Sequence, residues 1–399
     1  MTRRFLWICL WLVFGGGLGA QQVEVLWNRP LRVPANRNCR IPQFSPDGRL
    51  ISFEIRDNKN VFLYLYDISS DRTVQLGQGG EQSGGGLFAV GGGASNTYTG
   101  EITFYLDPLD KTLIFDFVHT PAFGQRVLYQ TDLGPDESIA TLARLPLSSD
   151  RFIRFDRLKG VAMVRYPALS HATTGTGLPW VVFSGRQNLF LFNHGQYDRP
   201  IQISEPAGVW ADVMPRFSPD DRKILFSRDS RQNTDIGLIH LAESQGRLVA
   251  QKTEMLLTGS AIEVSPEWAP DGRRFAYYSD EGHPKLFSIW IYELDSGKHY
   301  PVVDNVVPNS MRTRGPVWVG NRGLVFVRRA IEKGFPLMYY DLATRREVEI
   351  PTGTLNNLDT DVHMLGPDEF LLVYSAGGGN RDEEGLIWTK LYLAKIRIK

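Results

Sequence analysis

Hydrophobic residues in this chain come in short runs or in alternation, and Gly, Pro, Asn and Asp separate them. The runs at residues 61–67, 235–241 and 286–293 are examples, each rich in aromatic or branched side chains. This pattern is typical of β-strands, and few stretches carry apolar residues at helical spacing. We therefore predict an all-β fold.

A six-residue phrase recurs along the chain: an aromatic residue, Ser or Ala, Pro, Asp, Gly or Asp, and Arg. A β-rich run follows each copy, so the phrase predicts a hairpin turn in which Pro fixes φ, Asp accepts backbone N–H groups and Gly supplies positive φ. The aromatic residue would end an innermost strand and pack between neighbouring sheets. We predict structural roles for Phe44, Pro46, Asp47, Gly48, Phe217, Pro219, Asp220, Trp268, Pro270, Asp271, Gly272 and, in a looser copy, Trp318.

Hairpins repeated at intervals of roughly 50 residues indicate a repeat array such as a β-propeller. Degenerate copies near residues 105, 178 and 365 bring the number of repeats to seven. We predict one seven-bladed propeller of four-stranded antiparallel blades. The alternative has six blades, with the segment around Pro179 and Trp180 as an inserted hairpin. The strand-like run 22–27 would close the ring as the outer strand of the last blade, or else pair with the first blade.

The first twenty residues have the order of a secretory signal peptide. Arg3 and Arg4 precede ten apolar residues, and a small-residue segment ends at Ala20. Because a membrane span needs about 20 apolar residues, we expect cleavage after Ala20 and no stable span afterwards. Residues 21–399 would form the propeller, with a Gly-rich flexible loop at about 77–100. The single remaining cysteine, Cys39, excludes an internal disulfide and favours the bacterial periplasm, with the extracellular space as the alternative.

Charge and motifs point away from several functions. The chain has 44 basic and 44 acidic residues, which gives no reason to expect nucleic acid as a partner. It contains no Gly-x-Ser-x-Gly, no His-Glu-x-x-His and no second cysteine to share a zinc ion after processing. The seven histidines are scattered, although histidines that converge on the axis could hold a metal. We predict no catalytic residue, metal site or cofactor.

The recurring phrase resembles the Pro-Asp, WD-like repeat of TolB-like β-propellers. That repeat occurs in TolB-like periplasmic proteins and in the propeller domains of some peptidases. The resemblance extends over nearly all of residues 21–399. Only about 24 residues separate Ala20 from Phe44, too few for the α/β domain that precedes the propeller in TolB. The resemblance therefore implies the propeller alone.

The loops between the second and third strands of the predicted blades are rich in charge, and binding residues tend to lie on such loops. We predict a binding face made of Arg56, Asp57, Arg228, Asp229, Arg231, Asp280, Glu281, His283, Arg328 and Arg329. The function expected is that of a non-enzymatic, exported scaffold that binds a protein or peptide of the bacterial cell envelope. The alternative is a propeller enzyme, a lyase or glycosidase acting on polysaccharide with residues near the axis.

Overall fold

The computed structural model describes residues 23–399 except 35–37, 58–59, 77–98, 123–124, 144, 156–160, 162–163, 174–177, 194–199, 231, 246, 310–313, 331–333 and 382–386. The predicted signal peptide and most of the predicted Gly-rich loop lie outside the described residues. Thr99 and Gly100, which we had placed in that loop, belong to a strand. No helix in the described ranges is long and apolar enough to cross a membrane.

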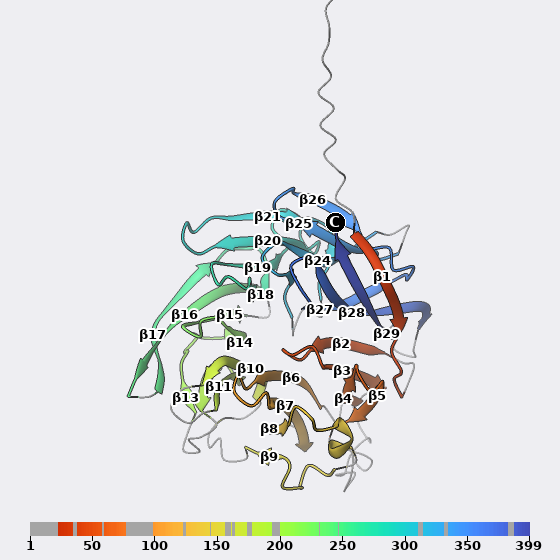
Figure 1. Cartoon of the computed structure of the whole chain (residues 1–399). Coiled ribbons are helices and arrows are strands. Elements are labelled where there is room, and N and C mark those ends of the chain that lie inside the picture. The colour runs from red at the N-terminus through yellow and green to blue at the C-terminus, as the bar shows by residue number, and fades with distance from the viewer. Residues whose placement is uncertain are drawn as a thin grey trace, which may run out of the picture.

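The strands form seven antiparallel sheets arranged in a ring, and the chain visits the sheets in order (Figure 1). The strands of each blade are given from the axis outward. Blade 1 is β2 (Cys39–Phe44), β3 (Leu50–Asp57), β4 (Asn60–Asp67) and β5 (Arg72–Gln75), and blade 2 is β6 (Thr99–Leu106), β7 (Leu113–Ala122), β8 (Gln125–Leu133) and β9 (Ile153–Arg154). Blade 3 is β10 (Val164–Thr173), β11 (Pro179–Gly185), β12 (Asn188–Asn193) and β13 (Ile201–Gln202). Blades 4 and 5 are β14 (Ala211–Phe217), β15 (Lys223–Asp229), β16 (Thr234–Ser244), β17 (Arg247–Leu257); and β18 (Glu263–Trp268), β19 (Arg274–Ser279), β20 (Ser288–Glu293), β21 (His299–Val303).

The last two blades differ slightly from the others. Blade 6 has a divided innermost strand, β22 (Val306–Val307) and β23 (Val317–Val319), followed by β24 (Gly323–Arg328), β25 (Leu337–Asp341) and β26 (Arg346–Glu349). Blade 7 is β27 (Asn357–Met364), β28 (Glu369–Arg381), β29 (Ile387–Ile398) and β1 (Val23–Pro30). The fold is thus a seven-bladed β-propeller. The six-bladed alternative is wrong, because residues 179–185 form β11, the second strand of a complete blade.

Strand β1 closes the ring, as the sequence predicted. It pairs antiparallel with β29, from Val23 opposite Ile398 to Pro30 opposite Tyr392, and lies beside the C-terminal strands in Figure 1. Val23 and Val25 pack against Ile396 and Ile398 in the hydrophobic cluster between blades 6 and 7. The alternative, in which this strand pairs with the first blade, is wrong.

Hydrophobic cores lie between neighbouring blades rather than inside one of them. In one cluster, Leu50 and Leu65 of blade 1 meet Phe115 and Phe117 of blade 2, and all four side chains are fully buried. Burial of a large apolar side chain contributes about 1.5–3 kcal/mol, and only a second sheet can cover the face of the first. Each blade therefore depends on its neighbours, and the ring depends on closure.

Removal of β1 tests this dependence. A protein that begins at residue 31 loses the backbone ladder of β1 and the packing of Val23 and Val25. We expect its free energy of unfolding to fall by at least about 3 kcal/mol relative to a protein that begins at residue 21. Urea denaturation followed by tryptophan fluorescence measures the difference. Equal midpoints for the two proteins would show that closure contributes little.

Candidate functional site: the axial cavity

The Pro-Asp turns are held by local hydrogen bonds at the end of each innermost strand. In blade 1, Ser45 Oγ accepts the Leu50 N–H at 2.9 Å and Asp47 Oδ1 accepts the Arg49 N–H at 3.1 Å. Gly48 has a φ of +70° and donates its N–H to the Ser45 carbonyl at 2.9 Å. The same carboxylate-to-backbone bonds occur in blades 4 and 5, at Asp220 with Arg222 and at Asp271 with Arg273.

The aromatic residue before each turn reaches the preceding blade. Phe44, Phe217, Trp268 and Trp318 are buried. Trp268 Nε1 donates to the Arg216 carbonyl and Trp318 Nε1 donates to the Glu267 carbonyl, both at 3.1 Å. Each indole therefore bonds to the innermost strand of its neighbour, in addition to filling the space between the two sheets.

A β-bulge interrupts most of the innermost strands three residues before this position. The strand register shifts there in β2, β6, β10, β14 and β18. In each of these strands one residue has a positive φ between 52° and 56°: Ile41, Glu101, Tyr166, Met214 and Ser265. Such a conformation is unusual for residues with branched or bulky side chains. The bulge turns side chains toward the axis and takes backbone groups out of the sheet ladder.

Side chains of the preceding blade accept the N–H groups that the bulges release. The Ile41 N–H donates to Asp359 Oδ2 at 3.2 Å, and the Ser265 N–H donates to Ser227 Oγ at 3.2 Å. The Tyr166 N–H donates to the Glu101 carboxylate. Because a buried N–H without an acceptor is costly, these bonds fix the neighbouring innermost strands relative to one another.

A cavity of about 410 Å³ lies where the innermost strands meet on the axis. All seven blades contribute to its wall, which reaches the turn residues Ser45 and Pro46 and His171 of β10. Four carboxylates, from Glu54, Glu101, Glu267 and Asp361, and two guanidinium groups, from Arg216 and Arg314, are among the described residues of the wall. The aromatic residues of the wall are Phe44, Phe104, Tyr166, Phe217, Trp268 and Trp318.

Most of these charges are paired across blade boundaries. Arg314 Nη1 lies 2.9 Å from Asp361 Oδ1, and Arg216 Nε lies 3.4 Å from Glu267 Oε2. Asp361 also accepts the Phe44 N–H at 2.8 Å. The cavity therefore presents ion pairs and aromatic faces, an arrangement suited to a ligand that carries both donors and acceptors.

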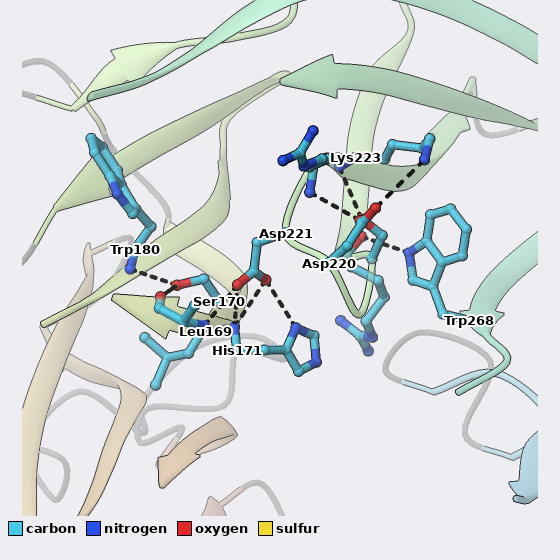
Figure 2. A network of polar contacts seen from close by, with 12 residues as sticks. Leu169, Ser170, His171, Trp180, Asp220, Asp221, Lys223 and Trp268 are labelled. Carbon is cyan, nitrogen blue, oxygen red and sulfur yellow. Dashed lines mark hydrogen bonds and ion pairs between the residues drawn. The ribbon is translucent and has the colours of Figure 1, made fainter. Parts of the chain in front are cut away.

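His171 and Asp221 form a contact between blades 3 and 4 at the rim of the cavity (Figure 2). Asp221 occupies the turn position that Gly48 and Gly272 hold in the other copies, with a φ of +54°. Its carboxylate accepts the His171 N–H at 2.9 Å and the Ala172 N–H at 2.7 Å, and Oδ1 lies 2.9 Å from His171 Nδ1. Asp221, which stands where the other copies have glycine, therefore links blade 4 to blade 3 through these hydrogen bonds.

Several residues of the predicted loop face are engaged within the protein. Arg228 Nε and Nη2 donate to Asp212 at 2.7 and 3.0 Å. Arg328 forms ion pairs with Asp304 and Glu347. The Asp280 carboxylate is buried and accepts the Ile262 and Lys285 N–H groups at 2.8 and 2.9 Å.

The remaining predicted residues of the loop face do not form one cluster that the structure describes. Glu281, His283 and Arg329 are exposed, and Asp229 is half-buried. Arg56 and Asp57 lie in β3, but their side chains and the whole of Arg231 are outside the described residues. The binding role of this face stays a prediction.

Sequence reasoning missed the innermost-strand residues that line the cavity. A signal for them exists, because an Xaa-Pro pair stands just before the aromatic position in four blades and before the equivalent Leu169 in blade 3. The prolines are Pro42, Pro167, Pro215, Pro266 and Pro316. Proline lacks an N–H and is confined to edges and bulges in sheets, so this pair marks the bulge.

Metal and thiol chemistry find no support in the described part of the chain. No group of three His, Cys, Asp or Glu side chains there is placed to hold a metal ion. Cys39 is fully buried, and burial raises the pKa of its thiol to about 12. A thiol with so high a pKa is unreactive near neutral pH.

Solved structures support the fold. The chain is similar to a Mycobacterium tuberculosis puromycin-hydrolyzing peptidase, with 12% identity, a TM-score of 0.55 and coverage of 88% of this chain and 52% of the peptidase. It is also similar to TolB from Acinetobacter baumannii, with 12% identity, a TM-score of 0.45 and coverage of 77% and 64%. A third similar structure is the Cps50 (Swd1) β-propeller domain of Myceliophteria thermophila, with 10% identity, a TM-score of 0.49 and coverage of 93% and 98%.

The similarity to the peptidase, at a TM-score of 0.55, supports the fold and nothing beyond it. The chain spans about half the length of the peptidase and 64% of the length of TolB. No family model and no curated protein matches the chain. The class of the protein, a seven-bladed β-propeller, follows from its strand topology.

Substitution of Gly48 tests the contact between the last and first blades. Gly48 and Gly272 have φ values of +70° and +65°, so alanine should cost about 1 kcal/mol at either position. An added Cβ at Gly48 would overlap the His363 ring, whereas at Gly272 the nearest atom is Pro219 Cδ at 3.5 Å. We expect Gly48→Ala to lower the free energy of unfolding by at least about 1 kcal/mol more than Gly272→Ala. Equal losses in urea denaturation would contradict this contact.

Substitution of Asp221 by glycine separates backbone strain from the bond between blades. Glycine relieves the positive φ but removes the acceptor for the His171 and Ala172 N–H groups. We expect Asp221→Gly to destabilise the protein by about 1–3 kcal/mol, because hydrogen bonds to a charged group exceed the gain in backbone freedom. Thermal unfolding of the variant beside Asp221→Asn measures this. A glycine variant more stable than the wild type would show that the link is dispensable.

Proposed function

We propose that this protein is a non-catalytic, exported β-propeller that binds a protein or peptide segment of the bacterial envelope in its axial cavity. The observation that carries the proposal is the wall of that cavity, where aromatic faces alternate with ion pairs contributed by adjacent blades. Its volume of about 410 Å³ is in the range of ordinary binding pockets. A peptide segment offers the donors, acceptors and apolar groups that such a wall can contact.

The engagement of the cavity carboxylates favours binding over hydrolysis of polysaccharide. A glycosidase needs two carboxyl groups that can reach the sugar, one of them to donate a proton. Glu267 and Asp361 instead engage Arg216 and Arg314, and Glu101 accepts the Tyr166 N–H. The peptidase similarity covers only the propeller-sized half of that enzyme, and this chain has no Gly-x-Ser-x-Gly sequence. The envelope location rests on residues 1–20 and on the resemblance of the repeat.

A bulky residue in the cavity wall tests the proposal. Gln43 lines the cavity, so Gln43→Trp should fill part of it, whereas Gln202→Trp places the same residue on the exposed outer strand of blade 3. Residues 21–399 with an affinity tag are produced in a bacterial periplasm, and bound proteins are quantified by mass spectrometry. We expect one stoichiometric envelope protein with the wild type and with Gln202→Trp, and at least about tenfold less with Gln43→Trp.

Two results would overturn the proposal. One is capture of the same partner in equal amount by Gln43→Trp and the wild type, which would place binding away from the cavity. The other is cleavage of envelope polysaccharide by the purified protein, which would make it an enzyme. Circular dichroism of the three proteins checks that a lost partner does not reflect lost folding.

A further inference from the structure

Glu263, the first residue of β18, is a buried carboxylate that lacks a cationic partner in the described part of the chain. Only 7% of the residue is exposed. Its Oε2 atom has no hydrogen-bond partner among the described residues. Removing an ionised carboxylate from water is costly unless a cation or several donors compensate. A group of this kind is a candidate for binding a cation that the described residues do not supply.

The corresponding position of blade 4 shows what compensation looks like. Asp212 lies five residues before Phe217, as Glu263 lies five residues before Trp268. Asp212 is opposite Arg228 in the strand register and receives two hydrogen bonds from it. The residue opposite Glu263 is Ser279, which carries no charge. Blade 5 therefore has the acid of this pair but not the arginine.

Three more carboxylates lie around Glu263 at the junction of blades 4 and 5. A bridge between Thr234 and Ile262 places Asp235 and Glu263, the next residue on each strand, side by side. The Ile262 N–H also donates to Asp280 Oδ1 at 2.8 Å, which brings the loop after β19 to the same point. Glu281 follows in that loop and is exposed. The junction belongs to the loop face of the propeller, and none of its four acids lines the axial cavity.

We infer that Glu263, Asp235, Asp280 and Glu281 form a binding site for an alkylammonium group, such as the side chain of a lysine on a partner molecule. An ammonium group on a flexible stem is a compact charge with three donors, so it can enter past exposed Glu281 and supply the missing partner of Glu263. No group of three His, Cys, Asp or Glu side chains in the described ranges is placed to hold a metal ion, so the inference concerns an organic cation. The site is separate from the cavity, and the inference does not depend on the proposed function.

The charges around Glu263 also make the site sensitive to pH. Burial, and then the charges of Asp235, Glu281 and Asp280, raise the pKa of Glu263 to about 7. Tyr277 of β19 also faces Glu263, and Arg228 of β15 acts on Asp235. A cation binds the ionised carboxylate and competes with its proton. Binding should therefore strengthen as the pH rises through about 7.

The test uses two small probes that share an unbranched four-carbon stem. N-acetyl-lysine methylamide carries the ammonium group, and N-acetyl-norleucine methylamide is its neutral counterpart. Each is titrated into the full propeller, residues 21–399, at pH 6 and pH 8, with binding followed by NMR chemical shifts. The variants are Glu263→Gln, which keeps the shape and removes the charge, and Glu205→Gln, which removes an exposed carboxylate elsewhere. Calcium chloride is titrated as the metal probe.

We expect the wild type and Glu205→Gln to bind the lysine probe more tightly at pH 8 than at pH 6, and to ignore the norleucine probe. Glu263→Gln should bind the lysine probe at least about tenfold more weakly and lose the pH dependence. Its melting temperature at pH 8 should equal or exceed that of the wild type, because the substitution removes an uncompensated buried charge. This result would separate lost binding from lost folding.

The inference is overturned if neither probe binds, if both bind equally, or if Glu263→Gln retains the affinity for lysine. Calcium that binds more tightly than the lysine probe and depends on Glu263 would identify a metal site instead. A melting temperature that falls in Glu263→Gln would mean that the carboxylate has a structural partner within the protein. Failure of the partner capture at the axial cavity would leave these measurements unaffected.

Discussion

A buried backbone N–H group that makes no hydrogen bond within its own sheet needs another acceptor. The bulges in the innermost strands of this propeller create such N–H groups. The acceptors are side chains of the preceding blade, such as Asp359 for Ile41, Glu101 for Tyr166 and Ser227 for Ser265. The bond is thus made between blades and not within one. Hydrophobic packing holds the sheets together, but it is non-directional. These polar bonds fix how far each blade is rotated about the axis.

The same requirement shapes the cavity. Glu101 lines its wall and is also an acceptor for a released N–H group, and Asp361 combines an ion pair with Arg314 and a bond to the Phe44 N–H. Side chains that organise the ring are therefore also the side chains that a ligand would meet. Glu263 differs from them, because its Oε2 atom has no hydrogen-bond partner among the described residues.

The repeat phrase was sufficient to predict the blades, since it contains the whole of a local turn: Asp47 and Asp271 bond to backbone atoms two residues away. Closure by β1 was also predictable, because a strand-like run at residues 22–27 precedes the first repeat phrase. The cavity was not, since its wall combines residues from seven blades whose register depends on the bulges. Charge on a loop does not by itself identify a binding residue, since Arg228 bonds to Asp212 on the neighbouring strand of its own blade. Only the folded chain shows which charges are already satisfied.

Closure has a consequence for the order of events during folding. Val23, the first described residue, pairs with Ile398 near the C-terminus, so the final ladder joins residues that are separated by nearly the whole sequence. Such non-local contacts form late, because the loss of chain entropy comes before the contacts that offset it. Until then, β1 and β29 each present an open strand edge that could pair with another copy of the chain. The chain is therefore most prone to aggregation in the time before closure. The longer this time lasts, the more the chain would depend on a chaperone.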